Sequence, residues 1–148
     1  MTSKLDVKYM KLALKEAKKA YLEDEVPIGC VIVVDDLVIK AHNTKEKQKD
    51  ATCHAEINAI KKACKKLGEK VLPEATLYVT IEPCLMCLGA MLQARIKRVV
   101  YGAKEDKFGA TSILDEYKTN HTLEVCSGLL ENEAKELMQE FFKAKRLK

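Results

Sequence analysis

His54-Ala55-Glu56 and, further along the chain, Pro83-Cys84-Leu85-Met86-Cys87 are the two stretches that decide the fold. Together they offer one imidazole, two thiols and one carboxylate. Cys84 and Cys87 are three residues apart, so on a helix both thiols lie on one face, where a single tetrahedral Zn²⁺ can bind them. His54 can supply a third ligand. The fourth position then stays available for water, which is the arrangement of catalytic rather than structural zinc.

The cysteine pair alone is a weak indicator of zinc, because this spacing also suits a redox pair, half of a structural zinc site or ordinary core packing. Here the pair follows a predicted strand and Pro83, and it opens a predicted helix whose free N–H groups stabilise thiolates. A structural site would need a fourth ligand, but Cys53 adjoins His54, and adjacent residues rarely both reach one metal. The other cysteines fall on apolar stripes or strands, where cysteine packs as a small hydrophobe: Cys30, Cys64 and Cys126.

Glu56 is the carboxylate of this constellation that no metal needs as a ligand. It lies two residues after His54, where it can take a proton from zinc-bound water and pass it to a leaving group. Taken alone, it would be read as an acidic residue at a helix start. Zinc held by two thiolates carries little residual charge and suits the formation of hydroxide, which can add to an amidine-like carbon of an unstacked base and release ammonia.

Length and composition are those of one folded domain. The chain has 148 residues, of which 47% are apolar and 32% charged, enough for a core without disulfides. No apolar run approaches the roughly 20 residues of a membrane span, and residues 1–11 are polar rather than signal-like. These features predict a cytoplasmic protein, in which six cysteines point to metal binding or core packing. The net charge of +4 permits an anionic partner without requiring one.

The hydrophobic pattern predicts helices alternating with strands. Helices are expected at 4–22, 54–66, 84–94 and about 129–146, strands at 28–34, 37–41, 76–81, 98–101 and 123–126, and irregular chain at 42–52 and 104–120, with one helical turn near Ile113. This order favours an α/β fold with a sheet covered on both faces, in a single domain of residues 1–148.

Three local features carry further expectations. Gly29, inside a strand, indicates a close approach by another group, such as a ligand. Pro83 suits the first turn of the helix that follows, and that helix is mostly apolar and therefore expected to be buried. Gly102 is expected to close the strand before it.

The C-terminal segment 141–148 places four cations beside Phe141 and Phe142. Cations favour helix C-termini, so a solvated helix end is the simple interpretation. Because aromatic and cationic side chains together also suit single-stranded RNA, an RNA-facing surface is the alternative.

The order H-x-E followed by P-C-x-x-C is the signature of zinc nucleobase deaminases. The chain resembles one family of these, the bacterial tRNA-specific adenosine deaminases of the cytidine deaminase-like superfamily. The likeness runs nearly end to end and is carried by Glu25-Val26-Pro27-Ile28-Gly29, His54-Ala55-Glu56-Ile57, Leu77-Tyr78-Val79-Thr80-Ile81-Glu82-Pro83-Cys84, Met86-Cys87, Gly89-Ala90-Met91, Arg95-Ile96, Val99-Val100-Tyr101-Gly102-Ala103, Asn120-His121 and Phe141-Phe142. The zinc motifs fit the whole superfamily, and the two C-terminal matches narrow the resemblance to this family.

The resemblance implies a three-layer α/β/α fold with a mixed five-stranded sheet, and a homodimer with active sites near its interface. It implies hydrolytic conversion of adenosine to inosine at the wobble position of an arginine tRNA anticodon, with one Zn²⁺ per subunit and no nucleotide cofactor. His54, Cys84 and Cys87 would hold the zinc, and Glu56 would shuttle protons.

The resemblance also assigns contacts with the RNA. Asn43 matches the residue that hydrogen-bonds the flipped adenine, and Phe142 belongs to the final helix beside the anticodon loop. Glu105 stands where the family has an aspartate associated with a ribose contact, and we expect Glu105 and the nearby Lys107 to contact the substrate. These matches favour the RNA-facing interpretation of the tail. Two alternatives stay open: a zinc-stabilised RNA-binding protein without catalysis, and a deaminase of free nucleosides or bases.

Overall fold

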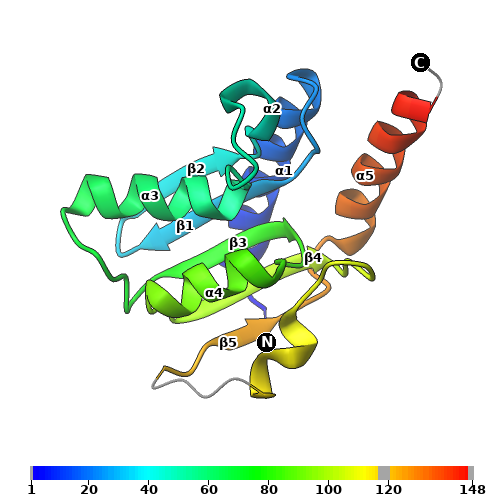
Figure 1. Cartoon of the computed structure of the whole chain (residues 1–148). Helices are drawn as coiled ribbons and strands as arrows, with labels where there is room; N and C mark the ends of the chain where they lie inside the picture. The colour runs from blue at the N-terminus through cyan, green and yellow to red at the C-terminus, as the bar shows by residue number, and fades with distance from the viewer. Residues whose placement is uncertain (1, 117–120, 147–148) are drawn as a thin grey trace.

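The computed structural model describes residues 2–116 and 121–146 (Figure 1). Asn120 of the family resemblance and Leu147 and Lys148 of the basic tail lie outside the described residues. The elements in chain order are α1 (Lys4–Leu22), β1 (Gly29–Val34), β2 (Leu37–His42), α2 (Lys45–Gln48), α3 (Ala55–Leu67), β3 (Thr76–Ile81), α4 (Leu85–Gln93), β4 (Arg98–Ala103), the 3₁₀ helix η1 (Thr111–Glu116), β5 (Glu124–Cys126) and α5 (Glu131–Arg146).

A mixed five-stranded sheet forms the middle of the molecule, with strand order β2-β1-β3-β4-β5. β1 pairs antiparallel with β2 through the Asp35-Asp36 hairpin and antiparallel with β3. β3, β4 and β5 run parallel to one another, so the carboxyl ends of β3 and β4 meet at one edge. The expected fold class is therefore confirmed.

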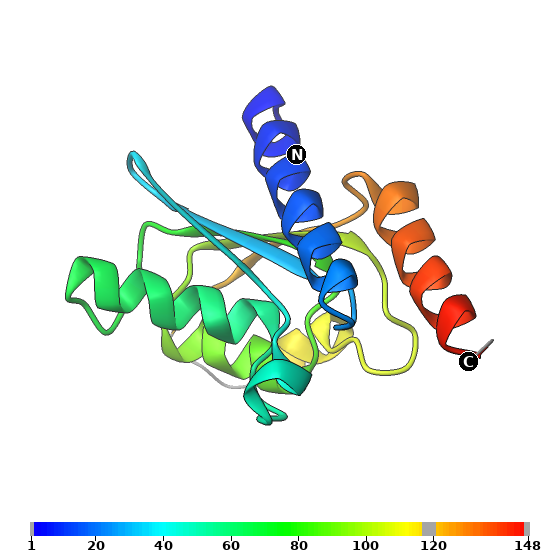
Figure 2. The same ribbon diagram turned by 90° about the horizontal axis from the view of Figure 1, so that it is seen from above.

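Helices cover both faces of this sheet. Seen from above, α1 and α5 lie on one face and α3 and α4 on the other (Figure 2). The three central strands, β1, β3 and β4, are almost wholly apolar and buried; Ile32, Val79 and Val99 have no exposed surface. Strands buried on both faces read as apolar runs, which explains why the sequence predicted β3 at its observed bounds and the first residue of β4, Arg98.

Gly29 does make the close approach that its place in a strand indicated, but its neighbour is α1 rather than a ligand. A Cβ added at Gly29 would lie 1.9 Å from the Ala13 carbonyl oxygen and 2.5 Å from the Ala17 nitrogen. Glycine at this position lets α1 lie directly against β1. The space is occupied by backbone, so the expectation of a ligand there was wrong.

The remaining differences from the predicted pattern are local. A short helix, α2, interrupts the segment expected to be irregular, because the buried Glu25 carboxylate accepts the backbone N–H groups of Glu46 and Lys47. Gly102 lies inside β4, whose last residue is Ala103, rather than closing the strand. The helical turn expected near Ile113 is confirmed as η1. None of the helices in residues 2–116 and 121–146 is long and apolar enough to cross a membrane.

The start of α4 also differs. Cys84 is the N-cap residue, with extended backbone, so Pro83 precedes the helix instead of occupying its first turn. Cys87, Leu88 and Met91 are buried, as expected of an apolar helix. Leu85 and Met86 were expected to be buried with them, but they are 52% and 37% exposed. One side of α4 is therefore an apolar surface open to solvent.

Candidate metal centre

Two helix starts meet at the candidate metal centre. His54 is the N-cap of α3, Cys84 is the N-cap of α4, and Cys87 is the third residue of α4. The His54 Nδ1 atom lies 3.6 Å from the Cys84 Sγ atom and 3.4 Å from the Cys87 Sγ atom. The three ligand atoms all lie within 4.8 Å of one another. The structure thus brings together all three residues expected to bind metal, from segments about 30 residues apart.

The spacing of these atoms fits zinc. A nitrogen and a sulfur bound to one tetrahedral Zn²⁺ at about 2.0 and 2.3 Å lie about 3.6 Å from each other. The two N···S distances, 3.6 and 3.4 Å, match that tetrahedral edge. Across the described parts of the chain, no further His, Cys, Asp or Glu joins the group. Three ligands with one open position is the composition of a catalytic site.

The protons of this group are unevenly shared. The pKa of Cys84 falls to about 3, chiefly because the Cys87 thiol donates a hydrogen bond to it. For the same reason the pKa of Cys87 rises far above its usual range, and contact with Cys84 raises the pKa of His54. A thiolate is therefore favoured at Cys84, whereas the Cys87 thiol keeps its proton. A divalent cation would displace that proton and take the two sulfur atoms and the imidazole nitrogen as ligands.

Glu56 lies beside the centre as the second residue of α3. Its side chain is only 4% exposed. Burial raises the pKa of its carboxyl to about 7, although the nearby His54 acts in the opposite direction. A buried carboxyl that is near half protonation at neutral pH can both accept and donate a proton.

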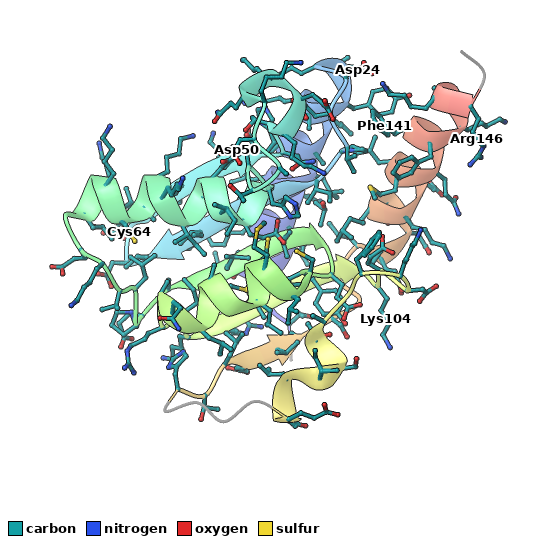
Figure 3. All side chains as sticks on the ribbon, in the orientation of Figure 1. Asp24, Asp50, Cys64, Lys104, Phe141 and Arg146 are labelled. Atoms are coloured by element: carbon teal, nitrogen blue, oxygen red, sulfur yellow. The ribbon has the colours of Figure 1, made fainter. Side chains whose placement is uncertain are left out.

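The other cysteines have separate environments. Cys30 is fully buried in the core, and the Cys53 thiol donates a hydrogen bond to the Gln48 side chain at 3.3 Å. Cys64 lies towards the far end of α3 (Figure 3) and Cys126 lies in β5, 3.6 Å from an Arg98 nitrogen. None of these four joins the His54, Cys84 and Cys87 group within the described residues, so none of them supplies a fourth ligand there.

Asn43 follows β2 directly and is 3% exposed. Its backbone N–H donates to the Ile28 carbonyl at 3.2 Å, and the next N–H, that of Thr44, donates to the Cys53 carbonyl at 3.0 Å. Asn43 is thereby held next to the segment that enters His54. In the part of the chain that the structure describes, the side-chain amide of Asn43 has no hydrogen-bond partner, and its polar atoms reach solvent, because every fully buried side-chain nitrogen and oxygen has one. An amide in this position is suited to reading a bound ligand.

Glu105 and Lys107 lie in the loop between β4 and η1, which flanks Cys84 through an isolated bridge between Cys84 and Gly109. The Glu105 carboxylate accepts the backbone N–H of Lys107 at 2.9 Å, so it stabilises the turn of its own loop. The Lys107 ammonium lies over the ring of Phe108, 5.3 Å from its centroid. Both residues belong to the loop that flanks Cys84, but Glu105 is already engaged within that loop.

Phe142 is not brought to the metal centre. α5 covers the opposite face of the sheet from α3 and α4, and Phe142 is exposed with its ring edge-on to Phe141 (Figures 1 and 2). Phe141 faces α1 and packs against Tyr21, whereas Arg146 points away (Figure 3). Lys145 pairs with Asp24 at 2.8 Å, so part of the basic tail serves to attach α5 to α1.

Three residues that shape the site were not singled out from the sequence. Glu25 holds α2. Glu82 accepts the N–H groups of Glu105 and Thr111 and thereby ties the 104–111 loop to the end of β3. Asn58 donates to the segment that carries Asn43. A carboxylate directly after a buried strand, as at Glu82, is the signal that could have found one of them, because such a group needs local N–H donors.

A five-stranded mixed sheet with a His/Cys/Cys group at two helix starts and a buried glutamate beside it defines a deaminase of the cytidine deaminase-like class. The family model described as MafB19-like deaminase matches residues 5–146.

Curated relatives give the narrower family. The chain is 45% identical to the tRNA-specific adenosine deaminase of Bacillus subtilis over 97% of its own length and 92% of the relative, and 46% identical to that of Agrobacterium fabrum over 94% and 95%. The chain belongs to the tRNA-specific adenosine deaminase family.

Solved structures agree with this assignment. One from a study of A-to-I editing by tRNA:A34 deaminases at the wobble position superimposes with a TM-score of 0.85 at 44% identity, over 88% of this chain and 98% of that one. A guanine deaminase from Bacillus subtilis matches less closely, with a TM-score of 0.64 at 35% identity, over 79% of this chain and 81% of that one.

Proposed function

We propose that this protein is a zinc-dependent hydrolase that converts adenosine to inosine at the wobble position of a tRNA anticodon, and that residues 1–148 form one deaminase domain. One observation carries the proposal: the ligand atoms of His54, Cys84 and Cys87 lie within 4.8 Å of one another, with the buried carboxyl of Glu56 two residues from one of them. Relatives and a solved structure named for the same reaction support it.

The reaction is a hydrolysis in which the chain's own residues move protons. When bound, Zn²⁺ supplies a Lewis acid that makes a water molecule acidic enough to attack near neutral pH. Glu56 takes a proton from the attacking water and delivers it to the purine ring beside C6. It then transfers the second proton to the amino group, which leaves as ammonia, while oxygen remains on C6 as the carbonyl of inosine.

Recognition of the base falls to Asn43. Its amide has a donor and an acceptor end, both without partners within the described chain, and its backbone is held beside the segment that leads into His54. An adenine extruded from the anticodon loop can hydrogen-bond both ends. Because Asn43 is nearly buried, the base has to leave its stack to reach it.

The anticodon loop would extend beyond the metal centre to two surfaces. One is the 104–111 loop, with Glu105 and Lys107 beside the ribose; its two lysines and two acidic residues leave it without net charge. The other is the end of α5, with the exposed Phe142 and two basic residues of its last turn, Lys143 and Arg146. Phosphate contacts by these cations would make binding weaker at higher salt. The preference for an arginine tRNA rests on the family resemblance.

A homodimer would cover the apolar surface of α4. Leu85 and Met86 are exposed beside the metal ligands Cys84 and Cys87, and exposed apolar surface at a site commonly marks an interface. A partner there would also shield the centre from bulk water. With tRNA as substrate, the reaction would take place in the cytoplasm. Light scattering that gives the mass of a single chain at micromolar concentration would contradict the dimer.

A substrate panel tests the proposed function. The protein, loaded with one equivalent of Zn²⁺, is incubated with an anticodon stem-loop that carries adenosine at the wobble position, and in parallel with free adenosine, cytidine and guanine. We expect inosine in the stem-loop and much slower turnover of the free compounds, with activity lost on chelation and restored by zinc. Guanine is included because of the similarity to a guanine deaminase.

Faster turnover of a free base or nucleoside would mean that the substrate is a small molecule and not RNA. Binding of the stem-loop without any turnover would favour a zinc-stabilised RNA-binding protein.

A further inference from the structure

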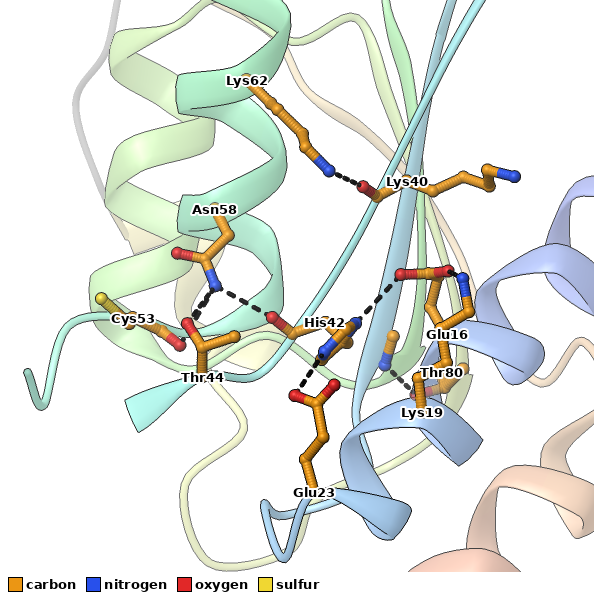
Figure 4. A network of polar contacts seen from close by, with 11 residues as sticks. Glu16, Lys19, Glu23, Lys40, His42, Thr44, Cys53, Asn58, Lys62 and Thr80 are labelled. Carbon is orange, nitrogen blue, oxygen red and sulfur yellow. Dashed lines mark hydrogen bonds and ion pairs between the residues drawn. The ribbon is translucent and has the colours of Figure 1, made fainter. Parts of the chain in front are cut away.

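Asn58 makes a set of hydrogen bonds that the proposed chemistry does not use (Figure 4). It lies on α3, one turn after His54, and its side-chain Nδ2 donates to the His42 carbonyl at 2.9 Å and to the Thr44 hydroxyl at 2.9 Å. The Cys53 carbonyl lies 3.4 Å from the same nitrogen. Because carbonyl oxygens can only accept, these neighbours also fix which end of the amide carries the hydrogens.

The two residues bound at 2.9 Å are those on either side of Asn43. Both hydrogens of the Asn58 amide are thus used to hold the segment 42–44 against α3, while the longer contact to Cys53 joins this segment to the residue before His54. Asn58 therefore links the residue proposed to read the base with the residue proposed to bind the metal.

The same segment is fixed from the opposite face of the sheet. The His42 imidazole contacts the Glu16 carboxylate through Nδ1 at 3.0 Å and the Glu23 carboxylate through Nε2 at 3.1 Å, both from α1 (Figure 4). The Asn43 N–H donates to the Ile28 carbonyl. The contacts from α1 and β1 leave one side of the segment, that facing α3, for Asn58 to define.

A half-buried amide with this environment is costly to replace by an apolar group. Without the two N–H groups, the His42 carbonyl and the Thr44 hydroxyl lose a donor at a half-buried site, and the segment 42–44 is free to shift away from α3. A shift of about 1 Å in a group that orients a substrate can cost about 100-fold in rate.

We propose that Asn58 is a positioning residue that holds Asn43 at the correct distance from His54 and Glu56 for reading a flipped adenine. The inference rests on the proposed function, since it takes Asn43 as the residue that contacts the base.

The test is a double-mutant cycle with Asn58→Leu and Asn43→Ala, measured as kcat/KM on the adenosine-bearing stem-loop. Asn58→Leu alone should lower kcat/KM by about tenfold, and by less than about twofold when Asn43 is already alanine, because coupled residues are not additive. Zinc content should stay at one ion per chain in every variant.

Lys62→Met is the matched control. Lys62 is one turn further along α3, and its ammonium donates to the Lys40 carbonyl of β2 at 2.6 Å, two residues before His42. It therefore makes the same kind of helix-to-strand contact without touching the segment 42–44. We expect kcat/KM of Lys62→Met to stay within about twofold of the wild type.

Two further measurements decide the question even if Asn58→Leu folds poorly or the wild-type protein is inactive. Thr44→Val removes one of the two acceptors, whereas Thr44→Ser keeps the hydroxyl and should restore kcat/KM. Amide hydrogen exchange reads the segment directly, because the N–H groups of Asn43 and Thr44 are both hydrogen-bonded. In Asn58→Leu we expect about tenfold faster exchange at these two amides, with no change in Lys62→Met.

An equal loss of kcat/KM with and without the Asn43 side chain would overturn the proposal, because Asn58 would then act on the fold in general. So would unchanged exchange at residues 43 and 44 in Asn58→Leu. If the wild-type protein produces no inosine, the proposed function fails by itself, and the exchange experiment still decides whether Asn58 positions Asn43.

Discussion

Two carboxylates, Asp6 and Glu56, are equally buried in this molecule, each with 4% of its surface exposed, yet their acidities move in opposite directions. The Arg98 guanidinium holds the pKa of Asp6 well below its usual range. Burial raises the pKa of Glu56 to about 7. Equal surface exposure therefore does not decide what a carboxylate does.

Their partners explain the difference. Asp6 accepts both terminal nitrogens of Arg98 at 2.9 Å and the Tyr78 hydroxyl at 2.6 Å, so its charge joins α1 to β3 and β4. Glu56 lies beside Cys84, whose low pKa favours a negatively charged thiolate, and this charge raises the pKa of Glu56 further. A carboxylate paired with a guanidinium stays charged and stabilises the fold, whereas Glu56, with no guanidinium beside it, has a pKa near neutral pH and can exchange a proton.

The largest effect in this comparison is expected from removal of the Glu56 carboxylate. Glu56→Gln keeps the shape and the helix start but cannot take up a proton, so we expect kcat on the stem-loop to fall about 1,000-fold. Zinc content and thermal stability should stay near those of the wild type, since the metal ligands are intact. Glu136→Gln, on the exposed side of α5, is the control. A loss of less than tenfold would mean that the Glu56 carboxylate is not the proton carrier.

Removing the cation from the paired carboxylate should have the next largest effect, on stability rather than chemistry. Arg98→Met leaves the Asp6 charge buried without its partner and should lower the free energy of unfolding by about 3 kcal/mol in urea titrations. Lys97→Met is the neighbouring control, because its contact with Glu74 is exposed at 3.8 Å and should be worth less than about 1 kcal/mol. Equal losses in the free energy of unfolding for Arg98→Met and Lys97→Met would show that the Asp6–Arg98 pair does not stabilise the fold.

The pH dependence of stability sharpens the same contrast. In the folded state the pKa of Asp6 lies below its ordinary value of 3.8, so its stabilisation is complete above that value and is lost as the pH falls below it. We expect the free energy of unfolding of the wild type to exceed that of Asp6→Asn by about 2 kcal/mol at pH 7, and this difference to narrow as the pH falls towards 2. Urea unfolding at several pH values gives both curves. A gap that widens in acid would show that Asp6 is not stabilised as an anion.

The sequence predicted what depends on periodicity and residue type, and it missed what depends on distant partners. The bounds of α1 and β3 follow from the spacing of apolar residues, and His54, Cys84 and Cys87 follow from their chemistry and order. The Asp6–Arg98 pair spans 92 residues, and no local pattern marks it. The same holds for α2, whose four residues are too short to show a period and whose stability comes from Glu25, about 20 residues earlier.

The smallest expected effect concerns the cap that accompanies the paired carboxylate. The Ser3 hydroxyl accepts the Asp6 N–H at 3.2 Å, and the Ser3 N–H donates back to the Asp6 carboxylate at 2.9 Å. Ser3→Ala removes only the first of these bonds and should cost about 1 kcal/mol in the same urea titrations, with the exposed Thr2→Ala as control. A cost as large as that of Arg98→Met would mean that the helix cap, and not the distant guanidinium, is what makes Asp6 the structural member of the pair.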